Sequence, residues 1–165
     1  MAISKTILLL GSNMGDRKKN LAAAVKEIST MIDKVTLQSK IYETEPWGNT
    51  DQEKFYNMCV VVDTPKEAEE IFRRTLMIEK KLGRVRNALQ YQPRIIDIDI
   101  LFVGDTVINT HQLTIPHEQI ANRRFTLTPL AEIVPDLIHP VLKKPVLELW
   151  NDCKDTLACI PVGTL

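Results

Sequence analysis

The stretch RVRNALQYQPRIIDIDILFV, from Arg84 to Val103, decides the fold of this chain. Its second half has an apolar side chain at every second position, as a β-strand with one buried face does. The apolar face consists of Ile96, Ile98, Ile100 and Phe102, and the opposite face of Ile95, Asp97, Asp99 and Leu101. We therefore predict a strand with its apolar face against a hydrophobic core.

Two carboxylates share the other face of this strand. Asp97 and Asp99 would lie roughly 7 Å apart, close enough that each disfavours ionisation of the other unless a cation lies between them. The candidates are a divalent metal and the arginines Arg84, Arg86 and Arg94. Arginine matches phosphate oxygens, and carboxylates suit Mg²⁺ that is bound together with substrate phosphates. The pattern indicates either a magnesium and phosphate site or a surface cluster of salt bridges.

Length and composition limit the number of domains and the classes of binding partner. The 165 residues fit one domain, 1–165, and 21 basic against 21 acidic residues give zero net charge, so no global field attracts nucleic acid or a membrane. The three cysteines lack the spacing of a zinc or redox site, which favours a reducing cytoplasm. The apolar run Ile7 to Leu10 is too short for a membrane span and is expected to be a buried strand.

Helical and extended patterns alternate along the chain. Strands are predicted at 7–10, 35–42, 55–63 and 95–102. One helix is predicted after Asp16, which is its N-cap, and a second after Thr64, which opens a capping box, with Gly83 as its stop. This order predicts an α+β protein with a ferredoxin-like split βαβ fold. Both helices would cover one face of an antiparallel sheet and leave the other face open. Extra C-terminal elements would include short helices at 125–133 and 145–152.

Several polar side chains have two interpretations each. Asn57 shares a strand face with Phe55, and its amide must pair either with backbone or with a ligand. Glu79 lies in the apolar stripe of the second helix, either at its edge or paired with an arginine. Trp47 belongs to a loop that is either a lid or a surface loop with a tucked tryptophan. His117 is either structural or a phosphate ligand.

The glycine-containing turn from Gly11 to Asp16 lacks the nucleotide-binding patterns GxxxxGK[ST] and GxGxxG. A plain connection between strand and helix is therefore favoured over a phosphate loop.

Taken together, these segments resemble the hydroxymethyl-dihydropterin pyrophosphokinase family. The matching segments, in the family's order, are Gly11-Ser12-Asn13, Tyr42-x-Thr44-x-Pro46-x-Gly48, Phe55-x-Asn57, Gly83-Arg84-Val85-Arg86, Pro93 to Ile100, Leu113-x-Ile115-Pro116-His117 and Asn122-Arg123-x-Phe125. The resemblance implies transfer of diphosphate from ATP to the hydroxymethyl group of 6-hydroxymethyl-7,8-dihydropterin, giving the pterin diphosphate and AMP in folate biosynthesis. Catalysis would rest on positioning and electrostatics.

The resemblance also implies site residues. Catalytic roles fall to Arg84, Arg94, Asp97 and Asp99, of which the two aspartates would hold two Mg²⁺ ions. The ATP site would include Glu79, Arg86, Ile100, Thr114, His117 and Arg123. The pterin would lie between Phe55 and Phe125, beside Thr44, Pro46, Trp47, Asn57 and Asp97. The expected partners are these two small molecules, without nucleic acid or membrane, and a monomer is expected.

This chain departs from the family pattern at Tyr91-Gln92, at Glu118 and at Trp47, which puts the lid contacts and nucleotide affinity in question. A different class, a ferredoxin-like nucleotide or nucleic-acid binding module, would need a basic open face. Zero net charge and two aspartates on that face disfavour it. A two-metal nuclease would need a third carboxylate ligand, and the sequence has none at a recognisable spacing from Asp97 and Asp99.

Overall fold

The computed structural model describes residues 2–48, 51–85 and 94–165. The main strands are β1 (Ser4–Ser12), β2 (Val35–Gln38), β3 (Ile41–Thr44), β4 (Phe55–Thr64), β5 (Asp97–Val103) and β8 (Cys159–Gly163), and β6 (Ile108–Asn109) pairs with β7 (Thr114–Ile115) in a separate hairpin. The helices are α1 (Arg17–Met31), α2 (Ala68–Lys81), α3 (Arg124–Ile133) and α4 (Val146–Asp152), with a 3₁₀ turn, η1 (Ile120–Asn122), before α3.

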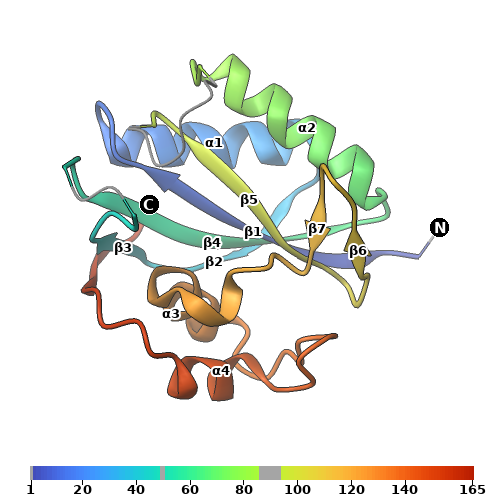
Figure 1. Ribbon diagram of the computed structural model, residues 1–165. Helices are drawn as coiled ribbons and strands as arrows, with labels where there is room; N and C mark the ends of the chain where they lie inside the picture. The colour runs from blue at the N-terminus through green and yellow to red at the C-terminus, as the bar shows by residue number, and fades with distance from the viewer. Residues whose placement is uncertain (1, 49–50, 86–93) are drawn as a thin grey trace.

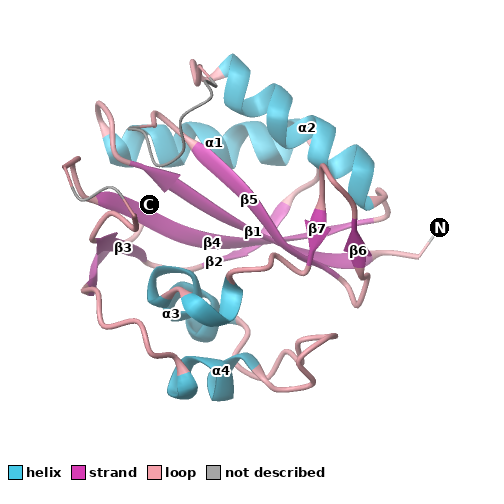
Figure 2. Cartoon of the chain, in the orientation of Figure 1, coloured by secondary structure: helices cyan, strands magenta, loops and turns pink. Residues whose placement is uncertain are grey.

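The large sheet is antiparallel throughout, with the order β5-β1-β4-β3-β8 and with β2 also paired to β4. Helices α1 and α2 cover one face of the sheet, and α3 and α4 lie on the opposite side (Figure 1). Figure 2 shows the same layers coloured by secondary structure. The predicted ferredoxin-like α+β fold is confirmed.

Each face of the sheet has its own hydrophobic core. The α1 and α2 side buries Leu8, Leu10, Ile28, Ile71, Ile98 and other residues, and the α3 and α4 side buries Ile7, Leu9, Cys59, Leu101, Leu127, Leu149 and others. The expectation of an open second face is therefore wrong for much of that face, because the C-terminal helices cover it. What remains of it is a pocket beside α3.

Strand β5 deviates from strict alternation near its end. Ile7 of β1 pairs with Phe102, but the next residue, Leu8, pairs with Ile100, so Leu101 is an extra residue in the ladder. Such a β-bulge changes which way the following side chains point. Phe102 therefore joins the core under α3 rather than the core of Ile98 and Ile100, contrary to the alternation expected from the sequence.

The helix ends agree with the sequence in part. Asp16 caps α1 and accepts a hydrogen bond from the Lys19 N–H at 3.1 Å, and Gly83, with φ +98°, follows the end of α2. The predicted capping box at Thr64 is wrong, since α2 begins only at Ala68. Thr64 instead ends β4, where it pairs with Ser4.

The strand predicted at 35–42 is interrupted, and β2 and β3 are separate. Between them, the buried Ser39 bonds to Cys59 of β4 in both directions: its N–H donates to the Cys59 carbonyl and its hydroxyl accepts from the Cys59 N–H, each at 2.9 Å. These two hydrogen bonds hold the segment between β2 and β3 against β4.

Candidate active site

The three central strands bring polar residues together at one end of the sheet. Gly11 of β1 lies opposite Asn57 of β4 on one side and opposite Asp97 of β5 on the other. The sequence suggested that the first strand stops at Gly11, but β1 continues through Ser12. Gly11 is therefore part of the sheet, between two expected site residues.

The absence of a side chain at Gly11 is a structural requirement. A Cβ at this position would lie 2.6 Å from Asn57 Oδ1 and 3.6 Å from Phe55 Cδ1. A glycine inside a strand often marks such a close approach. Sequence reasoning did not assign Gly11 a role in the site, and this placement of glycine next to an apolar strand was the signal that could have found it.

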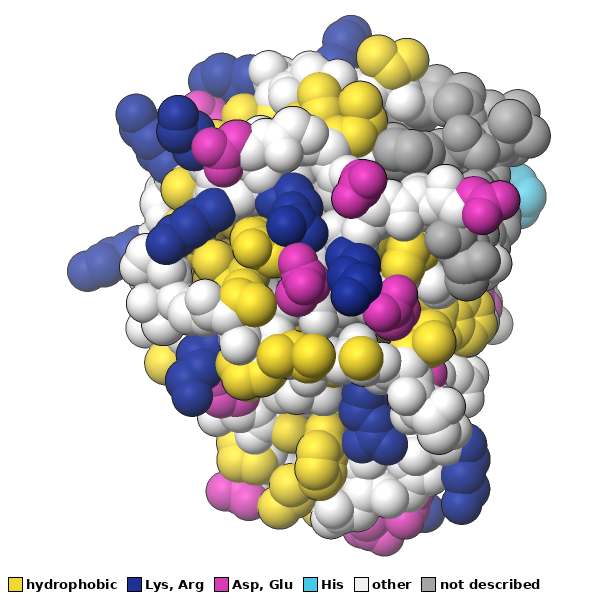
Figure 3. Space-filling model, turned by 90° about the vertical axis from the view of Figure 1, so that its left-hand side faces the viewer, with side chains coloured by type: hydrophobic (Ala, Val, Ile, Leu, Met, Phe, Trp, Pro, Cys, Tyr) yellow, Lys and Arg dark blue, Asp and Glu magenta, His cyan; other side chains and the backbone are white. Residues whose placement is uncertain are grey.

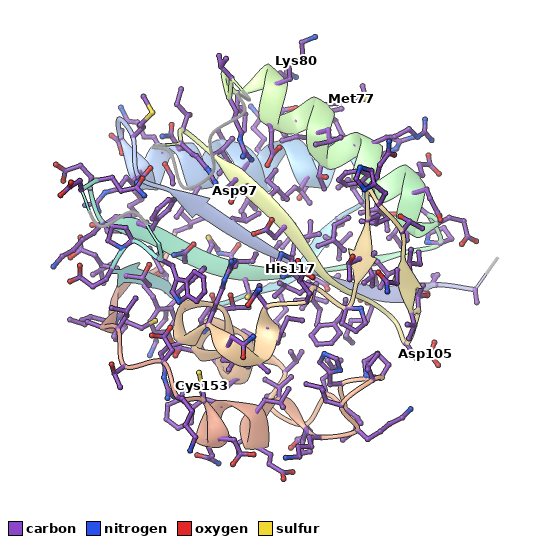
Figure 4. The ribbon with its side chains drawn as sticks, viewed as in Figure 1. Met77, Lys80, Asp97, Asp105, His117 and Cys153 are labelled. Carbon is purple, nitrogen blue, oxygen red and sulfur yellow. The ribbon has the colours of Figure 1, made fainter. Side chains whose placement is uncertain are left out.

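A pocket opens over this part of the sheet. Its lining residues are Leu9, Gly11, Thr44, Glu45, Trp47, Gln52, Phe55, Asn57, Arg94, Asp97, Asp99, Arg123 and Phe125. Figure 4 shows Asp97 near the start of β5. The pocket thus unites most of the expected pterin residues with both aspartates, although they come from distant parts of the sequence.

Asp97 is held by two arginines. Arg84 Nη1 lies 2.6 Å from Asp97 Oδ1, and Arg94 Nη1 lies 2.6 Å from Asp97 Oδ2. Burial alone would raise the pKa of Asp97, but Arg94 and Arg84 outweigh that effect and hold the pKa below its ordinary value. For Asp97, the interpretation as a salt-bridge cluster is thus part of the structure.

Glu79 lies behind this cluster, on α2. Its carboxylate is 2 % exposed and accepts from Arg84 Nη1 and from the Ile98 N–H, each at 2.7 Å. Of the two interpretations left open for Glu79, pairing with an arginine is the one the structure contains.

Asp99 differs from its neighbour. Its half-buried carboxylate has neither a hydrogen bond nor an ion pair to any residue that the structure describes. Burial, and then the charges of Asp97 and Glu79, raise the pKa of Asp99 to about 8, with partial compensation from Arg123 and Arg94. A carboxylate in this environment favours either a proton or a metal cation.

The donor set fits Mg²⁺ that shares its ligands with a substrate. Asp97 and Asp99 offer carboxylate oxygens from one strand face, and oxygen ligands are those that Mg²⁺ prefers. Within residues 2–48, 51–85 and 94–165, no group of three or more His, Cys, Asp and Glu side chains could hold a metal ion. Phosphate oxygens or waters would therefore have to complete the coordination.

The side of the pocket where the pterin is expected contains a buried amide. Asn57 Nδ2 donates to the Thr44 hydroxyl at 2.7 Å, a side-chain partner rather than the backbone partner considered from the sequence. Phe55, Phe125 and Trp47 supply aromatic surface around it. Trp47 lies tucked into the pocket wall with the Arg123 guanidinium 4.6 Å above its ring, which agrees with the second interpretation of this loop.

A second hollow lies on the other side of Asp99. Its lining residues are Phe72, Ile98, Asp99, Ile100, His111, Gln112, Leu113, Thr114, His117 and Glu118. Three residues expected at the ATP site, Ile100, Thr114 and His117, therefore meet here. Arg123 lines the first pocket instead, and Glu79 supports Arg84 from behind. Asp99 borders both hollows.

His117 lines this hollow, and Figure 4 shows where it lies relative to β5. Its Nδ1 accepts from the Gln119 backbone N–H at 3.2 Å, and the backbone N–H of His117 donates to the Leu101 carbonyl at 3.1 Å. Burial, reinforced by Arg123, lowers the pKa of His117. Glu118, the departure from the family pattern, is exposed, so its charge can stay in solvent. Arg86, Tyr91 and Gln92 lie outside the described residues.

Asn13 is another site residue that sequence reasoning left without a role. Its Oδ1 accepts from the Arg94 N–H at 2.7 Å, and its Nδ2 donates to Gln52 Oε1 at 2.9 Å and to the Glu53 carbonyl at 3.0 Å. The buried Asn13 thus ties the segment that carries Arg94 to the loop that carries Gln52. A buried asparagine directly after a strand was the available signal.

The fold and site define a class of protein: a ferredoxin-like α+β protein whose sheet presents carboxylates and arginines between two hollows, an arrangement suited to chemistry at phosphate groups. The family model for 7,8-dihydro-6-hydroxymethylpterin-pyrophosphokinase (HPPK) matches residues 7–135. The chain belongs to this family.

Relatives named 2-amino-4-hydroxy-6-hydroxymethyldihydropteridine pyrophosphokinase agree with this assignment. The protein from Methylorubrum extorquens is 41% identical over 137 residues, which cover 82% of this chain and 86% of the relative. The protein from Aquifex aeolicus is 36% identical over 139 residues, which cover 84% and 86%. Both bacterial relatives are thus similar to this chain over most of their length.

Other similar proteins are much longer than this chain. The Folic acid synthesis protein fol1 of Pneumocystis carinii is 42% identical over 132 residues, 80% of this chain but 18% of that protein. A crystal structure of a Plasmodium falciparum HPPK-DHPS triple mutant with pteroate has the same fold, with a TM-score of 0.73 at 19% identity over 91% of this chain and 43% of that one.

None of the helices in the described residues is long and apolar enough to cross a membrane.

Proposed function

We propose that this chain transfers diphosphate from ATP to the hydroxymethyl group of 6-hydroxymethyl-7,8-dihydropterin and releases AMP. The observation that carries the proposal is the position of Asp99, a carboxylate without a cationic partner among the described residues, between an aromatic pocket and a second hollow. Membership of the HPPK family supplies the reaction, and the presence of two hollows that share Asp99 supports a division of the site between two substrates.

The aromatic pocket suits the pterin. A flat heterocycle fits between the rings of Phe55 and Phe125, and the buried Asn57 amide offers a donor and an acceptor to its edge. The bond from Asn57 to Thr44 orients the amide before substrate arrives, which lowers the cost of ordering this side chain on binding. In this arrangement the hydroxymethyl group would face Asp97.

The second hollow suits ATP, with Ile100, Thr114 and His117 in its wall and Asp99 at its border. Since Arg123 lines the neighbouring pocket, its guanidinium is available to the phosphates where the two substrates meet. Two Mg²⁺ ions held by Asp97 and Asp99 would, when bound, neutralise phosphate charge and favour departure of AMP.

In the reaction, the hydroxymethyl oxygen forms a bond to the β-phosphorus of ATP. The bond from that phosphorus to the oxygen that bridges the α- and β-phosphates breaks, and AMP leaves with the electron pair while the hydroxyl proton passes to solvent. The part of the chain is positioning and electrostatics: Arg84 and Arg94 provide positive charge beside Asp97, and the pocket walls exclude water that would otherwise hydrolyse ATP.

The charge distribution supports small substrates over nucleic acid. The sequence has zero net charge, and acidic side chains lie among the basic ones on the face shown in Figure 3. We further propose one domain over 1–165 that acts as a monomer in the cytoplasm. The free cysteines Cys59, Cys153 and Cys159 support a reducing compartment.

The proposal is tested by incubating the purified chain with ATP, Mg²⁺ and 6-hydroxymethyl-7,8-dihydropterin and separating the nucleotides. AMP should form in step with consumption of the pterin and should not form without it. The Asp99→Asn variant is the control for contaminating nucleotidases. ADP as the product, or AMP formation that does not depend on the pterin, would overturn the proposal.

A further inference from the structure

Arg123 is held differently from the other described arginines of the site. Its guanidinium carbon lies 4.6 Å from the centre of the Trp47 ring and 5.6 Å from the centre of the Phe125 ring. Both distances are within the range of cation–π attraction. Arg84 and Arg94, by contrast, are bound to carboxylates at 2.6 to 2.7 Å.

The hydrogen-bond donors of Arg123 are not used inside the described chain. Its Nε is buried and has no hydrogen-bond partner there, and no ion pair to a described carboxylate is present. A buried donor without a partner is costly. The two aromatic faces therefore keep a cation in place while its donors remain available to an anionic ligand.

The location of Arg123 links the two hollows electrostatically. Burial raises the pKa of Asp99 and lowers that of His117, and the charge of Arg123 lowers both. Asp99 borders both hollows and His117 borders the second, so the guanidinium acts on groups at each. The contacts with the Trp47 and Phe125 rings hold the Arg123 guanidinium at this position.

We propose that Trp47 is a positioning residue that holds the Arg123 guanidinium for the phosphates of ATP. The proposal rests on the proposed function in so far as Arg123 binds ATP. Trp47 follows Thr44 and Pro46 on the loop expected to contact the pterin, so the nucleotide affinity of the enzyme depends on the pterin loop.

The test is a double-mutant cycle on nucleotide binding without turnover. Isothermal titration calorimetry with Mg²⁺ and a non-hydrolysable ATP analogue compares wild type, Trp47→Leu, Trp47→Phe, Arg123→Met and Trp47→Leu/Arg123→Met. Trp47→Leu should weaken binding about five-fold, as loss of a partly buried cation–π contact does, whereas Trp47→Phe keeps an aromatic face and should stay within about two-fold. In the Arg123→Met background, Trp47→Leu should have no further effect. Circular dichroism checks that each variant is folded.

Two results would overturn the proposal. An equal loss from Trp47→Leu in both backgrounds would mean that Trp47 acts on the nucleotide without Arg123, and no loss in either would mean that Arg123 needs no support. If AMP forms in the pterin-dependent assay but the cycle shows no coupling, only the role of Trp47 fails. If the cycle shows coupling but no AMP forms, only the diphosphate transfer fails. Absence of analogue binding to wild type would contradict both.

Discussion

The Glu79 carboxylate of α2 accepts a hydrogen bond from the Ile98 N–H of β5 across 2.7 Å. Ile98 lies between the two aspartates, and the same Glu79 oxygen lies 2.7 Å from Arg84 Nη1. A buried carboxylate on a helix thus fixes the strand that carries Asp97 and Asp99 and one of the arginines that neutralise Asp97. Glu79 therefore contributes both to the buried packing of α2 against β5 and to the position of the site residues.

Replacing Glu79 should therefore cost stability in a graded way. Glu79→Ala leaves the buried Ile98 N–H without an acceptor and removes a buried partner of Arg84, which should lower the free energy of unfolding by about 3 kcal/mol. Glu79→Gln keeps a carbonyl acceptor and should lose clearly less. Urea unfolding followed by circular dichroism measures both. Equal losses would show that the bond to Ile98 contributes nothing.

The two aspartates should separate stability from activity. Asp97→Asn deprives Arg84 and Arg94 of a carboxylate and should destabilise the fold by about 2 kcal/mol, whereas Asp99→Asn removes no described partner and should leave stability unchanged or improve it. Both variants should lose AMP formation by about 100-fold or more, since each removes charge from the reacting site. Thermal unfolding and the nucleotide assay report the two effects. Near-normal turnover in either variant would contradict the metal assignment.

The pKa of Asp99 predicts a pH dependence of stability without metal. The folded-state pKa is raised to about 8, well above the ordinary value for aspartate. Between these two values the folded state binds a proton that the unfolded state does not, so stability falls as the pH rises. Asp99→Asn removes this loss, and its advantage over wild type should grow by roughly 3 kcal/mol from pH 5 to pH 8. Urea unfolding at both pH values, in the presence of EDTA, measures it. An advantage that does not change with pH would contradict a raised pKa.

The close approach at Gly11 predicts an effect on the pterin through Asn57. A Cβ at residue 11 would lie 2.6 Å from Asn57 Oδ1, so Gly11→Ala should displace the amide and weaken pterin binding about ten-fold, while binding of the ATP analogue changes by less than about two-fold. The matched control is Gly11→Ala/Asn57→Ala, which should bind the pterin no more weakly than Asn57→Ala alone. Calorimetry with each ligand tests this. Equal weakening toward pterin and nucleotide would point to a general distortion of the sheet.

Local periodicity in the sequence was enough to predict the strand face of the two aspartates and the order of the main strands and helices. The alternation around Asp97 and Asp99 placed both carboxylates on one face, because side-chain direction in a strand depends only on position. The helix at Asp16 and the order of strands and helices followed from patterns of the same kind. The fold class was therefore predictable from the sequence.

The sequence-based predictions were wrong where pairing between distant strands determines the position of a residue. Phe102 lies on the other face of the sheet because of a bulge in its pairing with β1, and Thr64 is part of β4 because it pairs with Ser4. The ion pairs of Asp97 with both arginines, and the lack of a described partner for Asp99, also depend on three-dimensional placement. From the sequence, a salt-bridge cluster and a metal site were alternatives for both aspartates. In the structure, Asp97 is paired with Arg84 and Arg94, whereas Asp99 has no partner among the described residues.

In the proposed function, one chemical event moves two phosphoryl groups from ATP to the pterin between these hollows. Phosphorus-31 NMR of a reaction containing the chain, Mg²⁺, ATP and 6-hydroxymethyl-7,8-dihydropterin tests it most directly. The AMP resonance and the two coupled resonances of a diphosphate ester should rise together in equal amounts, and neither should rise without the pterin. The resonances of ADP together with a single phosphate ester, or inorganic phosphate alone, would contradict it.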